Sequence, residues 1–289
     1  MTDRLDSFTR SQWIVIEDDA GIVRRAPFET LLFSIPIRVA NGPEGPRIHR
    51  LDTGEALPVL RRYGYVWSAL DPAPRPLFEV PEFDEAGRRF TPCGPVGVKT
   101  SALRVIENFL DLAHFPFVHP GILGTESETE VIPYRVEIRR DVDEVWAVDC
   151  GFFQPKAMAA SSAGAQVEYR YRVAQPCSAV LYKTSPGRAG AFDLIGILVR
   201  PLQETACEVH AWMLMWDEES SDESLLQFQQ EIFLQDRIIL ENQIPHLLPL
   251  SAGMEIPTRA DATSIAYRRW LKNHGVIWGT CEGLPEVTA

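Results

Sequence analysis

The chain has 289 residues, of which 28 are basic and 40 acidic, so its formal net charge is −12. A field of this sign repels phosphate groups, which argues against nucleic acid and anionic membrane surfaces as partners. No apolar run is long enough to cross a bilayer, and the polar start MTDRLDSFTR does not resemble a signal peptide. We therefore expect a cytoplasmic protein.

The cysteines argue against a disulfide framework, a zinc ribbon and an iron–sulfur cluster in this chain. Their number is odd, and no two of them have the CxxC spacing. We expect reduced, mostly packed thiols at all five positions: Cys93, Cys150, Cys177, Cys207 and Cys281.

The first 70 residues predict short strands broken by turns. Strands are expected over 11–19, 31–40 and 63–70, and Asn41-Gly42-Pro43 marks a turn. The segment 71–83 contains four prolines, which favours an extended connector and a boundary within the chain.

A helical pattern follows the connector. Apolar residues recur at spacings of three and four from Leu103 to Phe115, and Pro116 is expected to end this helix because it lacks an amide hydrogen. Two later helices are expected over 224–243 and 263–274, the second ending at Gly275.

The middle of the chain predicts a sheet. Apolar and polar residues alternate strictly over 166–173, and further strands are expected over 134–149, 179–183, 192–201 and 205–216. Consecutive strands without intervening helices imply an antiparallel sheet. The predicted fold class is therefore α+β, with long helices packed on the sheet.

The residues that suggest chemistry lie between Glu107 and His119. Asp111 and His114 are three positions apart, about 60° around a helix, so they would share a face. His119 would lie about 140° from His114 on a continuous helix, but a helix that ends at Pro116 lets it turn back. Two imidazoles with a carboxylate beside one of them are typical of a metal site, where the carboxylate fixes the ring.

Two histidines leave a metal short of a ligand. A carboxylate from elsewhere would complete the triad of two histidines and one carboxylate that holds Fe(II) with open positions for dioxygen. The helix predicted over 224–243 offers Asp236, on a face with Ile232 and Ile239. A carboxylate on an apolar face is costly to bury unless it is paired or binds metal.

The same residues have plainer explanations. An HxxxxH pair occurs by chance, Asp111 could hydrogen-bond locally, and Asp236 could pair with Arg237 or Arg104. A zinc hydrolase could use the same three ligands, although the helix base candidate Glu107 lacks the HExxH spacing. A catalytically silent ligand-binding or scaffold protein is the alternative of another class.

Five further residues lie in the strand predicted over 205–216. His210 shares a strand face with Glu208, which indicates a packed residue rather than a ligand. Four residues could line a pocket for an aromatic substrate, although core packing is the simpler explanation: Trp212, Met213, Met215 and Trp216.

The pattern Asn108-x-x-Asp111-x-x-His114-x-x-x-x-His119 resembles the mononuclear-iron motif of the Rieske-type non-haem iron oxygenases, particularly their demethylase branch. The resemblance spans about residues 55–275 and continues in three segments: YGYVW (63–67), QDRIILENQ (235–243) and ADATSIAYRRWL (260–271). It implies a helix-grip, START-like catalytic domain.

The resemblance also implies roles for individual residues. His114, His119 and Asp236 would bind Fe(II). Asp111 would bridge toward an iron–sulfur cluster of a neighbouring subunit, and Asn108 would line the site. The expected reaction is oxidation of an aromatic or heterocyclic substrate, first of all N-demethylation of the 7-methylxanthine type with release of formaldehyde. O-demethylation and ring hydroxylation are the alternatives within the family.

One departure from the family is large. The family's N-terminal domain holds a [2Fe–2S] cluster on C-x-H and C-x-x-H ligands, and no cysteine precedes Cys93 here. Residues 1–75 therefore resemble a strand-rich remnant of the Rieske domain's flank, and residues 76–289 the catalytic domain. Electrons would come from a Rieske-containing reductase that carries the cluster, flavin and NAD(P)H. A trimer or a hetero-hexamer with a structural or related oxygenase subunit is expected.

Overall fold

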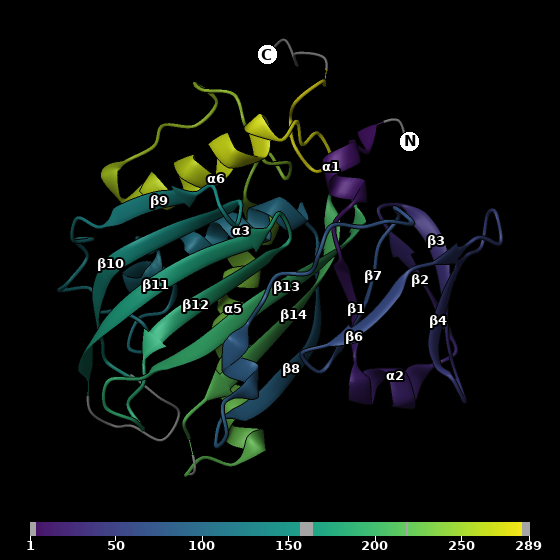
Figure 1. The fold of residues 1–289 in the computed structure, drawn as a ribbon. Helices are drawn as coiled ribbons and strands as arrows, with labels where there is room; N and C mark the ends of the chain where they lie inside the picture. The colour runs from purple at the N-terminus through teal and green to yellow at the C-terminus, as the bar shows by residue number, and fades with distance from the viewer. Residues whose placement is uncertain (1–3, 157–163, 218, 285–289) are drawn as a thin grey trace.

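The computed structural model describes residues 4–156, 164–217 and 219–284 (Figure 1). Within them the main feature is a seven-stranded sheet in the order β8–β14–β13–β12–β11–β10–β9, with every pair antiparallel. Its strands are β8 (Arg89–Val98), β9 (Arg135–Arg139), β10 (Glu144–Gln154), β11 (Ala165–Gln175), β12 (Ser178–Thr184), β13 (Phe192–Gln203) and β14 (Ala206–Met215). The predicted α+β class is confirmed.

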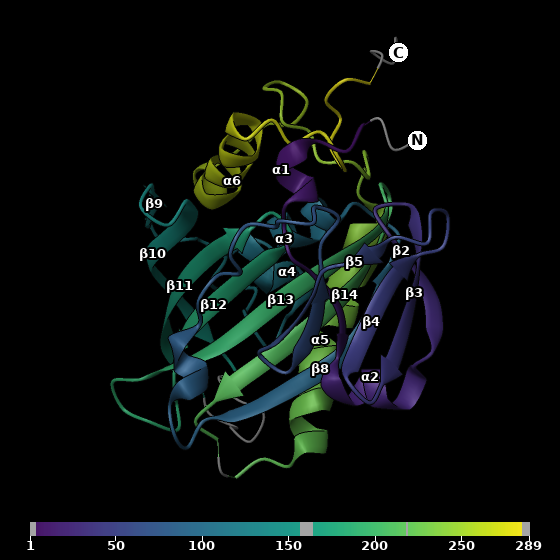
Figure 2. The ribbon, with the colours of Figure 1, turned by 45° about the vertical axis from the view of Figure 1, so that its right-hand side comes forward.

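Helices cover one face of this sheet. α3 (Ala102–Leu110) packs on β13, and α5 (Asp222–Asn242) packs on β8. α6 (Ala262–Asn273) lies beside β9 and β10 at the end of the sheet (Figure 2). The helices predicted over 224–243 and 263–274 are confirmed. No helix in the described part of the chain is long and apolar enough to cross a membrane.

The residues before the connector form two smaller antiparallel sheets beside the large one. β1 (Ile14–Asp18), β7 (Tyr65–Ser68) and β6 (Val59–Arg62) make the first sheet. β2 (Phe28–Leu32), β3 (Ile35–Gly42), β4 (Gly45–Arg50) and β5 (Ala56–Leu57) make the second. The short helices α1 (Ser7–Arg10) and α2 (Asp19–Arg25) flank β1.

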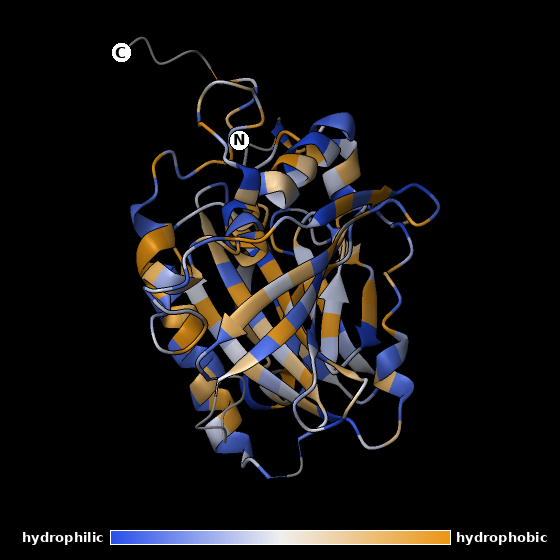
Figure 3. Ribbon diagram, turned by 90° about the vertical axis from the view of Figure 1, so that its left-hand side faces the viewer, coloured by the Kyte–Doolittle hydropathy of each residue, from blue (hydrophilic) through white to orange (hydrophobic). Residues whose placement is uncertain are grey.

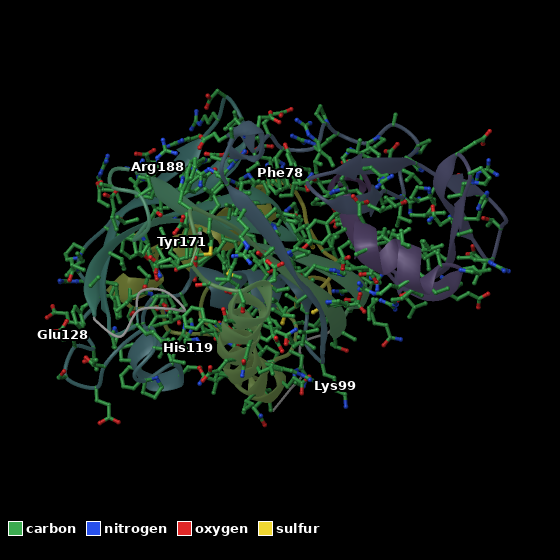
Figure 4. The ribbon with its side chains drawn as sticks, turned by 90° about the horizontal axis from the view of Figure 1, so that it is seen from below. Phe78, Lys99, His119, Glu128, Tyr171 and Arg188 are labelled. Atoms are coloured by element: carbon green, nitrogen blue, oxygen red, sulfur yellow. The ribbon has the colours of Figure 1, made fainter. Side chains whose placement is uncertain are left out.

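The proline-rich connector covers the sheet face that the helices leave open. Leu77, Phe78 and Val80 are buried there against Leu198 and Trp212. A 3-10 turn, η2 (Pro81–Asp84), then leads into β8. Phe78 and His119 lie on opposite sides of the large sheet (Figure 4), so the sheet separates this packing layer from the helix side.

Two predicted strands are hairpins. The strand expected over 31–40 turns at Phe33 and Ser34, whose φ angles are 52° and 63°. Their amide groups donate to the carbonyl oxygens of Pro201 and Leu202 at 2.9 and 2.8 Å, so the large sheet holds the turn. The strand expected over 134–149 is β9 and β10, with Asp143 in the turn. Alternation continues across such short turns, and sequence periodicity does not reveal them.

The helix predicted from Leu103 to Phe115 is shorter than expected. α3 ends at Leu110, because Asp111 is extended with φ −82° and ψ 123°. Pro116 does not end a helix; it stands in the first turn of α4 (Phe115–Val118), where its missing amide hydrogen costs nothing. β4, β8 and α2 were not predicted from the sequence.

Hydrophobic and polar residues alternate along the strands of the large sheet (Figure 3), and one glycine completes the packing on its connector side. Gly196 on β13 lies directly opposite Trp212 on β14. A Cβ at Gly196 would stand 1.9 Å from Cε2 of the Trp212 indole, which is 2% exposed. The glycine therefore makes room for the ring.

We expect Gly196→Ala to lower the free energy of unfolding by about 1–3 kcal/mol, because a packed ring must move to admit the methyl group. Gly97→Ala on β8 is the matched control, since a Cβ there has no heavy atom within 4 Å; it should change stability by less than about 0.5 kcal/mol. Urea unfolding followed by tryptophan fluorescence measures both. Equal stability of the two variants would contradict this account.

Candidate metal centre

Three side chains from two distant segments meet on the helix side of the sheet. His114 precedes α4 and His119 follows it, so this single turn brings the two rings to one point. Asp236 reaches them from the middle of α5. His119 is fully buried, and the His114 and Asp236 side chains are 13% and 15% exposed.

The atoms that face one another are nitrogen and oxygen. Asp236 Oδ1 lies 3.0 Å from His119 Nε2 and 3.2 Å from His114 Nε2, and the two Nε2 atoms are 3.2 Å apart. Among the described residues these three form the group with the spacing of a metal site.

The Nδ1 atoms of both histidines are hydrogen-bonded to oxygen acceptors. His114 Nδ1 donates to Asp111 Oδ2 at 3.2 Å, and His119 Nδ1 donates to Gln235 Oε1 at 2.7 Å. When Nε2 carries no proton, as metal binding requires, each ring therefore presents a lone pair to the common point, beside the oxygen of Asp236. Three lone pairs at this distance repel one another unless a cation lies between them, and orientation by outer hydrogen bonds is typical of metal-binding histidines.

The spacing of the three donor atoms is that of ligands sharing one metal ion. A metal about 2.1 Å from such donors holds them roughly 3.0 Å apart, whereas a tetrahedral ion holds them roughly 3.4 Å apart. Asn108 adds two observations. Its Nδ2 donates to Asp236 Oδ1 at 3.2 Å, while its buried Oδ1 has no partner among the described residues. The amide nitrogen of Asn108 therefore faces the triad, where it holds Asp236 in place.

The charged groups of the site shift one another's pKa values. Burial lowers the pKa of His114, but hydrogen bonds and charges of Asp111 and Asp236 outweigh it and raise the pKa to about 9. Burial raises the pKa of Asp236, and the two imidazoles more than offset it, so this pKa is lowered. Both directions show that the pocket favours positive charge between the carboxylates.

The plainer explanations of these residues are wrong in part. Arg237 pairs with Glu241 and Arg104 pairs with Glu107 and Glu255, so neither arginine is the partner of Asp236. The face of α5 also differs from the prediction: Asp236 lies between buried Ile232 and Leu240, whereas Ile239 is 50% exposed. Asp111 does bond locally, accepting from Ala113 N at 2.8 Å, in addition to its contact with His114.

Glu107 is tied into an ion-pair network that holds the metal segment in place. Arg104, fully buried, contacts Glu107 at 3.0 Å and Glu255 at 2.6 Å, and Arg268 pairs with the same two carboxylates. These contacts join α3, α6 and the loop before α6. A carboxylate held by two arginines is a poor general base, which argues against the zinc hydrolase.

Known proteins with similar sequences show the family of this chain. The family model described as the vanillate O-demethylase oxygenase C-terminal domain matches residues 98–275. The chain belongs to this oxygenase family. It is 49% identical over 221 residues to the probable methylxanthine N7-demethylase NdmC of Pseudomonas sp. (strain TJI-51), covering 76% of this chain and 78% of the relative.

More distant relatives share the architecture. The methylxanthine N1-demethylase NdmA of Pseudomonas putida is 26% identical over 233 residues, which cover 80% of this chain and 62% of that protein. The structure of NdmA from Pseudomonas putida CBB5 with caffeine superposes with a TM-score of 0.76 at 17% identity, covering 92% of this chain and 90% of that one. The resemblance to the catalytic domains of Rieske-type non-haem iron oxygenases is confirmed.

In this oxygenase a small cavity lies between the triad and the sheet. Its volume is about 90 Å³, and it is lined mainly by apolar side chains of α3, α5 and β11–β14. Met213 and Met215 line it, and both are also packed in the core, which was the simpler explanation from the sequence. Trp212 does not: strand alternation turns it to the connector side, where it packs 5.4 Å from Phe83. Trp216 faces the outer surface between Arg88 and Arg188.

A second hollow approaches the triad from the surface. This groove, of about 820 Å³, is lined by residues of α3, α5, α6 and the loop before α6, and it reaches Asp111. Asn108 and His114 line both the groove and the cavity. The candidate metal centre therefore forms the wall between an outer opening and an inner chamber.

Sequence reasoning missed some residues of the site. Gln235, which fixes His119, stands in the recognised segment QDRIILENQ, and its position next to Asp236 was the available signal. Lys183, on the cavity wall, gave no signal because its neighbours read as an ordinary strand. Cys207 and His210 do have C-x-x-H spacing, but an offset of three on β14 turns their side chains to opposite faces. His210 is buried against Glu208 at 3.1 Å, as predicted.

We expect anaerobically purified protein to hold about one iron per chain, and His119→Ala to lose it. Gln235→Ala should keep the fold but weaken iron binding by about 10- to 100-fold, since it frees the ring without removing a ligand. His49→Ala, at an exposed histidine, is the control. Mass spectrometry of metal content and competition with a chelator measure the effects; unchanged iron in both site variants would exclude this centre.

Proposed function

We propose that the chain is the oxygenase subunit of an Fe(II)- and O2-dependent N-demethylase that acts on a methylated purine-dione of the 7-methylxanthine type. The observation that carries the proposal is the triad of His114, His119 and Asp236, with Nε2 and Oδ1 atoms aimed at one point beside a mainly apolar cavity. The similarity to the probable methylxanthine N7-demethylase NdmC supports the substrate class.

Fe(II) bound there would supply dioxygen activation. Overall, the N-methyl group, one O2, two electrons and two protons give an N-hydroxymethyl group and water, and the N-hydroxymethyl group then releases formaldehyde to leave N–H. Because the two electrons are not available from these side chains, the reaction needs an external donor. This is the chemistry expected of a two-histidine, one-carboxylate site.

The protein's own residues would orient the reactants. Asp111 and Gln235 hold the two imidazoles in the tautomer that leaves Nε2 free to bind. Asn108 would steady Asp236 by donating from Nδ2 to its Oδ1. The apolar walls exclude water and bring a methyl group up to the site, which is what a positioning cavity contributes to such an enzyme.

The proposed electron donor is an iron–sulfur protein that docks over the groove. The Asp111 side chain is 27% exposed there and is hydrogen-bonded to His114, which gives a polar connection from the surface to the site. Exposed apolar side chains line the groove: Ile239 is 50% exposed and Ile256 93%. Exposed apolar residues gathered at one opening are typical of a protein-binding surface.

We further propose that residues 1–75 correspond to the flank of the family's Rieske domain and residues 76–289 to the catalytic domain. The two small sheets before the connector hold no cysteine, so a [2Fe–2S] cluster, flavin and NAD(P)H are assigned to a reductase partner. The proposed assembly is a trimer or a hetero-hexamer in the cytoplasm, where the five cysteines stay reduced; all five are free thiols in the structure.

We expect iron-loaded protein, supplied with O2 and a Rieske-containing reductase, to release one formaldehyde per 7-methylxanthine consumed. Asp111→Asn should retain iron but lower turnover by about 10- to 100-fold, because it disturbs the bridge between the surface and His114. Formaldehyde trapping and chromatography of the purine measure both. Stoichiometric zinc with no release of formaldehyde would favour a hydrolase. Binding of 7-methylxanthine without any turnover would favour a catalytically silent subunit.

We expect Ile256→Asp to weaken binding of the reductase and to raise the reductase concentration needed for half-maximal turnover, because a charge replaces an exposed apolar contact. Iron content and the Kd for the purine should stay unchanged, since Ile256 does not line the inner cavity. Val142→Asp is the control; this residue is 54% exposed in the β9–β10 turn, away from the groove. Equal loss in both variants would place the docking surface elsewhere.

A further inference from the structure

One wall of the groove is a single face of α6, and its charge changes along the helix. The residues of α6 and its N-cap that line the groove recur at spacings of three and four: Asp261, Ser264, Ile265, Arg268, Arg269 and Lys272. All three basic residues follow Ile265, in the C-terminal half of the helix. This end of the wall is therefore cationic.

Most charged groups of the groove already have partners within the chain. Every acidic residue that lines it is hydrogen-bonded or ion-paired there: Glu107, Asp111, Glu255 and Asp261. Arg268 is a partner of two of these carboxylates. The side chains of Arg269 and Lys272 are exposed and have no ion-pair or hydrogen-bond partner among the described residues. The uncompensated charge of the groove is thus positive.

This local charge is opposite to that of the whole chain. The net charge is −12, so the surface in general repels an acidic protein. Two free cations beside the groove give such a protein one place where approach is favourable. Charges at the rim of an interface raise the association rate and fix the orientation of the partner more than they add affinity. A basic protein would gain nothing from this wall.

We propose that the electron donor docks over the groove with an acidic patch against Arg269 and Lys272, and that these two cations set its orientation. The inference rests on the proposed function and adds the charge of the donor's contact surface. The exposed apolar residues Ile239 and Ile256 belong to α5 and to the loop before α6. A donor that meets both groups must place carboxylates on one side of its contact surface and apolar side chains on the other.

The composition of the chain makes a direct test possible, because it has only four lysines: Lys99, Lys156, Lys183 and Lys272. A carbodiimide joins an ammonium group to a carboxylate that touches it. The iron-loaded full chain is treated in this way together with a Rieske-containing reductase. Peptide mass spectrometry should find Asp and Glu residues of the reductase joined to Lys272. Lys272→Arg should abolish these cross-links and leave the complex intact, since it keeps the charge.

Charge reversal provides a second measurement. Arg269→Glu combined with Lys272→Glu should lower the association rate with the reductase by about tenfold and flatten its dependence on ionic strength. Arg24→Glu combined with Arg38→Glu is the matched control. Both arginines are exposed, have no partner among the described residues and lie outside the groove, on α2 and β3. Stopped-flow mixing at low and high salt measures both double variants, whose iron content and Kd for 7-methylxanthine should match the wild type.

The outcomes separate this inference from the proposed function. Cross-links from Lys99 or Lys156 instead of Lys272 would overturn the acidic patch, and so would cross-links only from lysines of the reductase to carboxylates of this chain. Equal slowing of the two double variants would assign the effect to net charge and would also overturn it. In each of these cases turnover with the reductase leaves the proposed function intact. The absence of both complex and turnover with a Rieske-containing reductase would overturn the proposed electron supply and this inference with it.

Discussion

The structure depends on three lone pairs that face one another in a buried place. His114 Nε2, His119 Nε2 and Asp236 Oδ1 stand 3.0–3.2 Å apart, and the opposite ring nitrogens are already bonded to oxygen. Without a cation this arrangement is unfavourable, because like partial charges meet where water is scarce. Two nearby features bring these atoms together. α3 ends at Leu110, and α5 holds Asp236 with its side chain only 15% exposed.

A network of ion pairs supports the segment that carries the centre. The network of Arg104, Glu107, Glu255 and Arg268 joins α3 to α6 and to the preceding loop, so the segment that carries His114 cannot drift outward. Buried ion pairs add little net stability, but losing one partner leaves an uncompensated charge. Such a network suits a role in fixing geometry more than in holding the fold together.

The sequence was sufficient for the fold class, the two long helices and most strands, because hydrophobic periodicity is local information. It did not reveal short turns such as Phe33-Ser34, where the alternating pattern runs on and the large sheet stabilises the positive φ angles. It paired Asp111 with His114 for the wrong reason: they meet through a turn, not along a helix. Gln235 was not recognised as the partner of His119, since the two residues lie far apart in sequence.

The position of the centre between groove and cavity separates two tasks. Asn108 and His114 line both spaces, while Asp111 belongs only to the groove and Lys183 only to the cavity. In the proposed arrangement, a donor docked over the groove would not touch a substrate held in the cavity. The hydrogen bond between Asp111 and His114 would then be the polar contact that links the two spaces.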